Sequence, residues 1–138
     1  KRDNNGNLIE SNKYNKDGEL EEKWKFIDQK DGNRAEENKY NKDGELENKW
    51  KFKYDDDGNR IESNKYDKDG ELEDNYMYKY YKAGNLMELT SYNEYGELDF
   101  KIEYKYEEFD DEKNWLKKIS YEDGKAFNIT KKEIEYYD

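Results

Sequence analysis

The sequence contains no cysteine, histidine, proline or valine, and these absences exclude several classes of protein. Without cysteine there are no disulfides and no thiolate metal sites. Without cysteine and histidine, the usual nucleophile and base pairs of enzymes are missing as well. No apolar run approaches the length of a membrane-spanning helix, and no signal peptide is visible in the chain. We therefore expect a non-enzymatic protein with no cofactor, no metal and no membrane-spanning segment.

Aliphatic side chains are also scarce, and the chain carries a net charge of −11 with 46% charged residues. Such a composition is typical of disordered chains. The order of the residues argues for a fold, because all nine glycines lie in turn positions and the apolar residues alternate as in strands. Burial must come mainly from the 15 tyrosines, three tryptophans and five phenylalanines, whose rings are large and amphipathic. A single-layer sheet fits this composition better than a packed sandwich.

Residues 40–66 set the pattern for the rest of the chain: a turn, a strand, a second turn and a second strand. Asn41 and Asp55 each start a tight turn, and Gly44 and Gly58 follow where a positive φ is needed. This is the signature of a type I turn closed by a G1 bulge. Between the turns, aromatic residues occupy every second position, which places them on one face of a strand.

Eight glycines fall at positions 6, 18, 32, 44, 58, 70, 84 and 96, so the steps alternate between 12 and 14 residues. The chain is therefore built of 26-residue repeats with one strand in each half. We expect an all-β fold, an antiparallel up-and-down meander of these two-strand repeats in a single-layer twisted sheet. Residues 1–138 would form one domain of about five repeats, regular over 3–106. Residues 107–138 would form an irregular C-terminal cap, because the segment 109–115 lacks glycine.

The turn geometry also predicts how neighbouring strands pair. The expected pairs are Tyr14 with Leu20, Asn12 with Glu22, Glu10 with Trp24, Tyr54 with Arg60, Phe52 with Glu62, and Trp50 with Asn64. If Trp24 pairs with Asn38 and Asn38 pairs with Asn48, equivalent positions of successive repeats drift by two residues per repeat. The sheet is therefore sheared. A sheared meander can stay open or close into an up-and-down barrel. The open form is favoured because the charged residues that this register puts on the aromatic face, Glu22, Arg34, Glu36 and Glu62, would be costly in a sealed interior.

The same register predicts one aromatic face for the whole sheet. Its expected members are Tyr14, Leu20, Trp24, Phe26, Tyr40, Leu46, Trp50, Phe52, Tyr54, Tyr66, Leu72, Tyr76, Tyr78, Tyr80, Tyr92, Leu98, Phe100, Ile102, Tyr104 and Tyr106.

The aspartates beside the turn glycines, such as Asp55 to Asp57 and Asp67, also suggest calcium. The EF-hand pattern fails, because its first ligand position would fall on Lys53 or Lys65. Turn chemistry explains these residues without a metal.

The segment Tyr54-Asp-Asp-Asp-Gly58-Asn-Arg60 resembles the tyrosine-aspartate (YD, Rhs-like) hairpin repeats of bacterial surface and secreted proteins. It is echoed at Tyr14 to Gly18 and at Tyr66 to Gly70. The resemblance covers residues 3–106 and extends in outline to MORN-type hairpin repeats. The strict 12 and 14 spacing departs from that pattern. The resemblance implies a scaffold or interaction role in a bacterial cell envelope or extracellular protein, and it carries over no catalytic residues.

The chain opens inside a turn, since Asp3 to Asn7 matches Asp55 to Asn59. This suggests a fragment of a longer array or a trimmed mature chain.

The aromatic face is the best candidate for a binding surface. Its predicted ligand- or partner-binding residues are Trp24, Phe26, Trp50, Phe52, Tyr54, Tyr76, Tyr78, Tyr80 and Tyr104. Tyrosine and tryptophan are favoured at protein interfaces, so we expect a protein-interaction scaffold with a protein partner or self-association through this face or the strand edges. The alternative is a carbohydrate-binding module, because Trp24 and Trp50 on alternate strands would lie about 9.6 Å apart, which suits a polysaccharide. With 37 acidic against 26 basic residues, nucleic acid is not expected as a partner.

Overall fold

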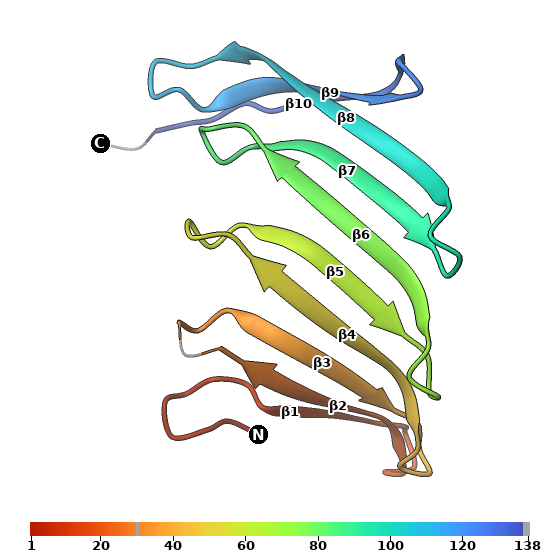
Figure 1. The fold of residues 1–138 in the computed structure, drawn as a ribbon. Coiled ribbons are helices and arrows are strands. Elements are labelled where there is room, and N and C mark those ends of the chain that lie inside the picture. Colours follow the sequence, from red (N-terminus) through yellow and green to blue (C-terminus); the bar gives the residue numbers. More distant parts are fainter. Residues whose placement is uncertain (30, 137–138) are drawn as a thin grey trace.

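The computed structural model describes residues 1–29 and 31–136, which form one ten-stranded antiparallel sheet (Figure 1). Each strand pairs with the next along the chain, from β1 at one edge to β10 at the other. The strands are β1 (Glu10–Tyr14), β2 (Leu20–Asp28), β3 (Arg34–Tyr40), β4 (Leu46–Tyr54), β5 (Arg60–Tyr66), β6 (Leu72–Tyr80), β7 (Leu86–Asn93), β8 (Leu98–Phe109), β9 (Trp115–Glu122) and β10 (Lys125–Lys131).

The predicted up-and-down meander in a single twisted layer is confirmed. Figure 1 shows the strands side by side in one layer, with the turns along two opposite sides. Within the described ranges there is no helix, and β1 and β10 do not pair with each other. The alternative of a closed up-and-down barrel is therefore wrong.

The turns have the predicted geometry. In the first hairpin the Asn15 N–H donates to the Glu19 carbonyl at 2.9 Å, and the Gly18 N–H donates to the Asn15 carbonyl at 3.1 Å. Gly18 has a φ of 81°, which places it in the left-handed region that glycine tolerates best. The same two bonds and the same glycine conformation recur around Gly44 and Gly58. Turn chemistry in each repeat therefore fixes where every strand begins and ends.

The turn between β8 and β9 keeps this geometry without a glycine. The Asp110 N–H donates to the Asn114 carbonyl, and the Lys113 N–H donates to the Asp110 carbonyl, both at 3.0 Å. Lys113 occupies the glycine position with a φ of 65°. The Asp110 side chain also accepts bonds from the Asn114 backbone and side chain. The spacing of Asp110 and Asn114 was thus a turn signal in the segment that we expected to be irregular.

We expect Lys113→Gly to stabilise the fold by about 1 kcal/mol, because it removes a side chain from a left-handed conformation that costs about 1–2 kcal/mol in non-glycine residues. Thermal denaturation of the variant and the parent chain measures the change. Lys42→Gly is the control, since Lys42 lies in an equivalent turn but is not among the residues with positive φ. A variant at position 113 that is no more stable than the control would contradict this role.

The predicted register holds at the first pair beside each turn and fails beyond it. Tyr14 pairs with Leu20 and Tyr54 with Arg60, as expected, but the next pairs are Lys13 with Glu22 and Lys53 with Glu62. A second bulge therefore follows each of these two turns, and it leaves one residue unpaired. The remaining predicted pairs are wrong by one residue: Asn12 pairs with Lys23, Glu10 with Lys25, Phe52 with Ser63, and Trp50 with Lys65.

A shift of one residue moves side chains to the other face, so part of the predicted aromatic face is wrong. Trp24 pairs with Lys39, whereas Tyr40 pairs with Lys23, so Tyr40 lies on the face opposite Trp24. The residues that move to this opposite face are Tyr14, Leu20, Tyr40, Leu46, Tyr66, Leu72, Tyr92 and Leu98, together with Glu36 and Glu62. The drift of two residues per repeat is confirmed, but it runs from Trp24 through Lys39, not Asn38, to Asn48.

Both faces of this single layer contain buried side chains: Phe52 and Ser63 lie on the face of the rings, and Ile119 lies on the opposite face, where it pairs with Lys105. Among the described residues, Phe52 and Ile119 are the apolar side chains that are fully buried, each 8% exposed. Ser63 and Ser91, each 1% exposed, lie on odd-numbered strands directly opposite ring residues of the even-numbered strands. These small side chains leave room for rings from two neighbouring even strands to meet above them. On the face of the rings, the core therefore consists of aromatic rings from the even-numbered strands packed over serines of the odd-numbered strands.

Candidate binding faces of the sheet

The aromatic face consists of Trp24, Phe26, Trp50, Phe52, Tyr54, Tyr76, Tyr78, Tyr80, Phe100, Ile102, Tyr104 and Tyr106 on β2, β4, β6 and β8. All nine residues predicted from the sequence as a binding surface lie on it. Side chains of alternate residues in a strand point the same way, and the ladder pairs place these strands in one common orientation. The structure therefore brings the predicted residues together on one surface.

A row of three rings crosses the middle of this face. The Trp50 and Tyr76 ring centroids are 5.9 Å apart with planes inclined by 30°. Tyr76 and Phe100 are 6.4 Å apart, inclined by 55°. All three rings are half-buried. The row is therefore continuous across β4, β6 and β8, but its rings do not share one plane.

Two other rings of the face are covered by arginines of the same chain. The Arg34 guanidinium carbon lies 4.2 Å from the Phe26 ring centroid, and that of Arg60 lies 4.1 Å from the Phe52 ring centroid. Arginine stacks on aromatic rings through cation–π and planar contacts. The exposed faces of Phe26 and Phe52 are thus occupied within the chain. This leaves the Trp50, Tyr76 and Phe100 row as the more accessible part of the surface.

Several tyrosine hydroxyls of the face serve the fold. The Tyr80 hydroxyl donates to the Arg60 carbonyl at 2.8 Å, and the Tyr106 hydroxyl donates to the Leu86 carbonyl at 2.9 Å. Burial raises the pKa of Tyr80 and Tyr106, and it raises the pKa of Tyr76 and Tyr104 as well. These four side chains therefore stay neutral at physiological pH.

The sequence did not single out Phe100 as a binding residue. Phe100 follows Tyr76 by 24 residues, not by the repeat length, because the sheet drifts by two residues per repeat. Ser91 pairs with both Tyr76 and Phe100, and this direct registration brings the two rings together. The alternation of apolar residues from Leu98 to Tyr106 was the signal that could have identified it.

The opposite face, which we call the lysine face, carries between one and three lysines on each of β2, β4, β6 and β8. Its lysines on these strands are Lys23, Lys25, Lys49, Lys51, Lys53, Lys79, Lys101 and Lys105. Tyr40 and Tyr66 lie beside them, with the Lys25 ammonium 5.2 Å from the Tyr40 ring centroid and the Lys51 ammonium 5.5 Å from that of Tyr66. An acidic chain thus presents a face on which basic side chains predominate.

Glu88 holds two of these lysines. Its carboxylate is 2.7 Å from the Lys79 ammonium and 2.8 Å from that of Lys101. Hydrogen bonds from Lys101 and Lys79 lower the pKa of Glu88 from its ordinary value of 4.5 to about 2. The Glu88 side chain is 13% exposed, whereas both lysines remain largely in contact with water. These two ion pairs therefore link β6, β7 and β8 on the lysine face.

We expect Glu88→Gln to lower the free energy of unfolding by about 1 kcal/mol at pH 7, a value that allows for solvent screening of the lysines. Because the pKa of Glu88 is depressed in the folded state, its contribution is present above about pH 4.5 and is lost as pH falls toward 2. Urea denaturation of both chains at several pH values measures the difference. Glu36→Gln is the control at the equivalent repeat position, where no ion pair forms within the described residues. A difference at position 88 that is as large at pH 2 as at pH 7 would contradict the assignment.

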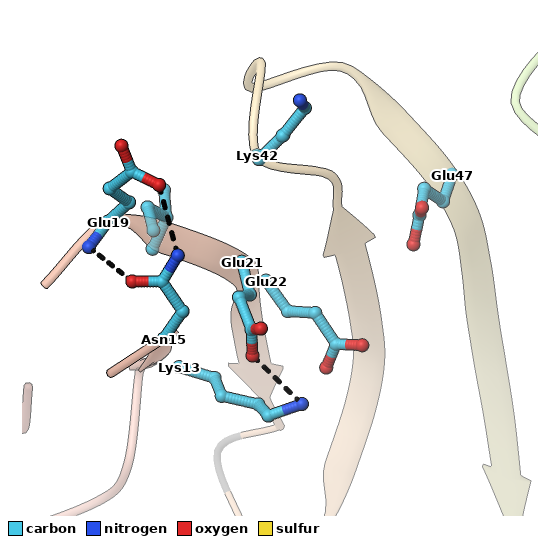
Figure 2. Close-up of a pocket in the computed structure, with 8 residues that line it drawn as sticks. Lys13, Asn15, Glu19, Glu21, Glu22, Lys42 and Glu47 are labelled. Atoms are coloured by element: carbon cyan, nitrogen blue, oxygen red, sulfur yellow. Dashed lines mark hydrogen bonds and ion pairs between the residues drawn. The ribbon is translucent and has the colours of Figure 1, made fainter. Parts of the chain in front are cut away.

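The turns form a third surface, shown in Figure 2 where β2 and β4 begin. Lys13, Asn15, Glu19, Glu21 and Lys42 line an open depression there. Asn15 donates from its side chain to the Glu19 carboxylate at 3.0 Å, and Lys13 pairs with Glu21 at 3.2 Å. Four of the five polar side chains therefore pair with each other in the exposed turn. The depression is therefore explained by turn structure without a ligand.

Neither a metal site nor a membrane-spanning helix is found in the part of the chain that the structure describes. No group of three or more carboxylate, imidazole or thiol side chains there is placed to hold a metal ion. No helix in those ranges has the length and apolar character needed to cross a bilayer.

No protein-family model and no curated protein matches the chain. Two solved structures are similar to part of its fold: a Photorhabdus luminescens Tc holotoxin pore with a TccC3 mutation, and a TcdB2–TccC3 complex with Cdc42. Each match covers 88% of this chain at 9% identity with a TM-score of 0.31. The chain spans only 9% and 10% of the length of the chains that it matches. A TM-score this low carries no argument about family or partners, so the resemblance to YD repeats stays a prediction.

Proposed function

We propose that the chain is a non-enzymatic repeat scaffold whose aromatic face binds protein. The observation that carries this proposal is the continuous row of half-buried rings, Trp50, Tyr76 and Phe100, on a sheet with no second layer. A sheet with one apolar face normally buries that face against another layer. Apolar patches above a few hundred Å² usually mark interaction sites.

The ring geometry favours protein over polysaccharide as the partner. Stacking of successive sugars needs free ring faces that share a plane. Arg34 and Arg60 cover Phe26 and Phe52, and the central rings are inclined by 30° and 55° to their neighbours. Protein side chains can interdigitate with such an uneven surface, and tyrosine, tryptophan and arginine are enriched at protein interfaces. A carbohydrate-binding module remains the alternative that a glycan array tests directly.

The first occupant that we propose for the aromatic face is a second copy of this chain. Two copies that pack these faces together would form a two-layer sandwich, the usual arrangement for sheets with one apolar side. The net charge of −11 opposes such a dimer, and salt screens this repulsion. Association should therefore strengthen as the ionic strength rises.

The setting that we propose is a bacterial surface or secreted protein. This rests on the likeness of Tyr54 to Arg60 to YD hairpin repeats, which implies an extracellular or cell-envelope location. The absence of histidine and cysteine supports a role in binding rather than catalysis.

Neighbouring residues on opposite faces of β6 provide a matched test by sedimentation velocity. Tyr76→Glu places a charge in the centre of the aromatic face, whereas Met77→Glu places the same charge on the lysine face, where Met77 is 39% exposed. We expect Tyr76→Glu to weaken self-association at least tenfold, as central aromatic residues of interfaces often do, and Met77→Glu to leave it unchanged. Circular dichroism confirms that both variants fold. Equal weakening by the two substitutions would contradict an interface on the aromatic face.

A further inference from the structure

The charges of this chain are segregated between its surfaces. The strand ladders pair ten lysines and six glutamates on the lysine face, while the rest of the chain carries 16 basic and 31 acidic residues. Although the net charge of the chain is −11, this face therefore carries an excess of positive charge. The overall negative charge argues against a polyanion as a partner of the chain. That argument does not apply to the lysine face taken by itself.

Three lysines in the middle of β2 and β4 lack the carboxylate partners that others on this face have. Lys23 pairs with Glu10 at 3.3 Å and Lys53 with Glu62 at 2.6 Å. Lys25, Lys49 and Lys51 form no ion pair with the described residues. In a chain with 37 acidic residues, three ammonium groups without a carboxylate partner on β2 and β4, the two strands that flank β3, mark a place suited to an external anion.

Asn38 lies between these lysines on β3. It pairs with Lys25 on one side and with Lys49 on the other. Asn38 is 7% exposed, and its side-chain carbonyl oxygen is buried without a hydrogen-bond partner. Glu36, two residues away, accepts from the Asn38 amide at 2.7 Å and pairs across the ladder with Lys51. The lysines thus surround a polar centre that contains one acid and one unsatisfied acceptor.

We propose that the lysine face binds a linear anionic polysaccharide, with carboxylate or sulfate groups on alternate sugars. Even strands recur about every 9.6 Å across the sheet, so a chain laid across β2 and β4 meets Lys25 and then Lys49, which Asn38 joins in one row of the ladder. The lysine ammonium is a compact, strongly hydrated point charge, which suits single carboxylates and sulfates.

The acidic turns do not cancel the field at this site. A nine-residue strand such as β4 spans about 30 Å, so its centre lies about 15 Å from either turn edge. That distance exceeds the Debye length of about 8 Å at physiological ionic strength. Lys49 and Lys51 lie near the centre of β4, where the turn aspartates are screened.

Titration calorimetry of the full chain with polygalacturonate, heparin and neutral dextran tests the proposal. We expect binding to polygalacturonate, to heparin or to both, no binding to dextran, and weaker binding at higher salt. The carboxylated and sulfated arms identify which anion the face prefers. The triple variant Lys25→Gln, Lys49→Gln and Lys51→Gln should bind the polysaccharide about tenfold more weakly, because each exposed lysine contributes only modestly to the binding free energy.

The control variant is Lys16→Gln with Lys42→Gln and Lys68→Gln, which changes net charge equally but alters turn lysines. It should bind like the parent chain, as should Tyr76→Glu, which alters the aromatic face. No binding at low salt, equal loss in both triple variants, or equal affinity for polyglutamate would overturn the proposal.

Acetylation of the unmodified chain gives a second measurement that needs no variant. Bound polysaccharide should protect Lys25, Lys49 and Lys51 more than the turn lysines, and equal protection would overturn the proposal too.

Discussion

Phe52→Ala should lower the free energy of unfolding by about 3 kcal/mol, the lower end of the range for phenylalanine in a core. Phe52 is 8% exposed, it stacks with Trp50 at 6.4 Å, and Arg60 covers its outer face at 4.1 Å. Truncation removes the ring from all these contacts and leaves Ser63 opposite an empty space. Urea denaturation of the two chains measures the loss.

Phe127→Ala is the control of the same chemistry. Phe127 lies on β10 and is 57% exposed, so its loss should change stability by less than about 0.5 kcal/mol. Equal effects at the two positions would mean that the ring layer does not act as the core of this sheet.

The double substitution Gly44→Val and Gly70→Val should cost about 2–4 kcal/mol, because a β-branched residue at positive φ is strained. Gly44 has a φ of 82° and Gly70 a φ of 88°. A Cβ added at either position meets no atom within 4 Å, so the cost is one of backbone conformation and not of collision. Thermal denaturation and far-UV circular dichroism measure the effect.

The matched control replaces the same glycines with asparagine, which enters the left-handed region more readily than most residues. We expect the asparagine variant to lose clearly less stability than the valine variant. Unchanged stability in the valine variant would contradict the turn geometry on which the fold rests.

The fold could be predicted from the sequence because its determinants are local. Glycine spacing and the Asx residues of each turn specify hairpins, and consecutive hairpins with short turns leave one topology. The register could not be predicted fully, because the second bulge beside Tyr14 and Tyr54 has no residue signature comparable to glycine. The extra residue of the bulge beside Asp28 decides the face of Tyr40, and that of the bulge beside Tyr54 decides the face of Tyr66.

The nine candidate binding residues were correctly predicted to share one face, although the register was not predicted correctly. Trp50, Phe52 and Tyr54 share a face through alternation within one strand, which no error in pairing can change. The arginines over Phe26 and Phe52 could not be predicted, since their rotamers depend on packing across strands. The excess of positive charge on the lysine face was missed, because overall charge averages surfaces that the fold separates.

The two faces should respond to salt in opposite directions. Association through the aromatic face is opposed by net charge, so screening strengthens it. Anion binding on the lysine face depends on attraction, so screening weakens it. A salt series on one preparation therefore separates the two proposals.

The most direct test of the account is photocrosslinking from the two faces of β6. A benzophenone amino acid at position 76 lies in the aromatic row, and the same group at position 77 lies on the lysine face. At roughly half-molar salt, where charge repulsion is screened, we predict a crosslinked dimer from position 76, joined to peptides of β4, β6 or β8, and little from position 77. Crosslinks mainly from position 77, or mainly to the edge strands β1 and β10, would contradict the claim that the aromatic face is the protein-binding surface.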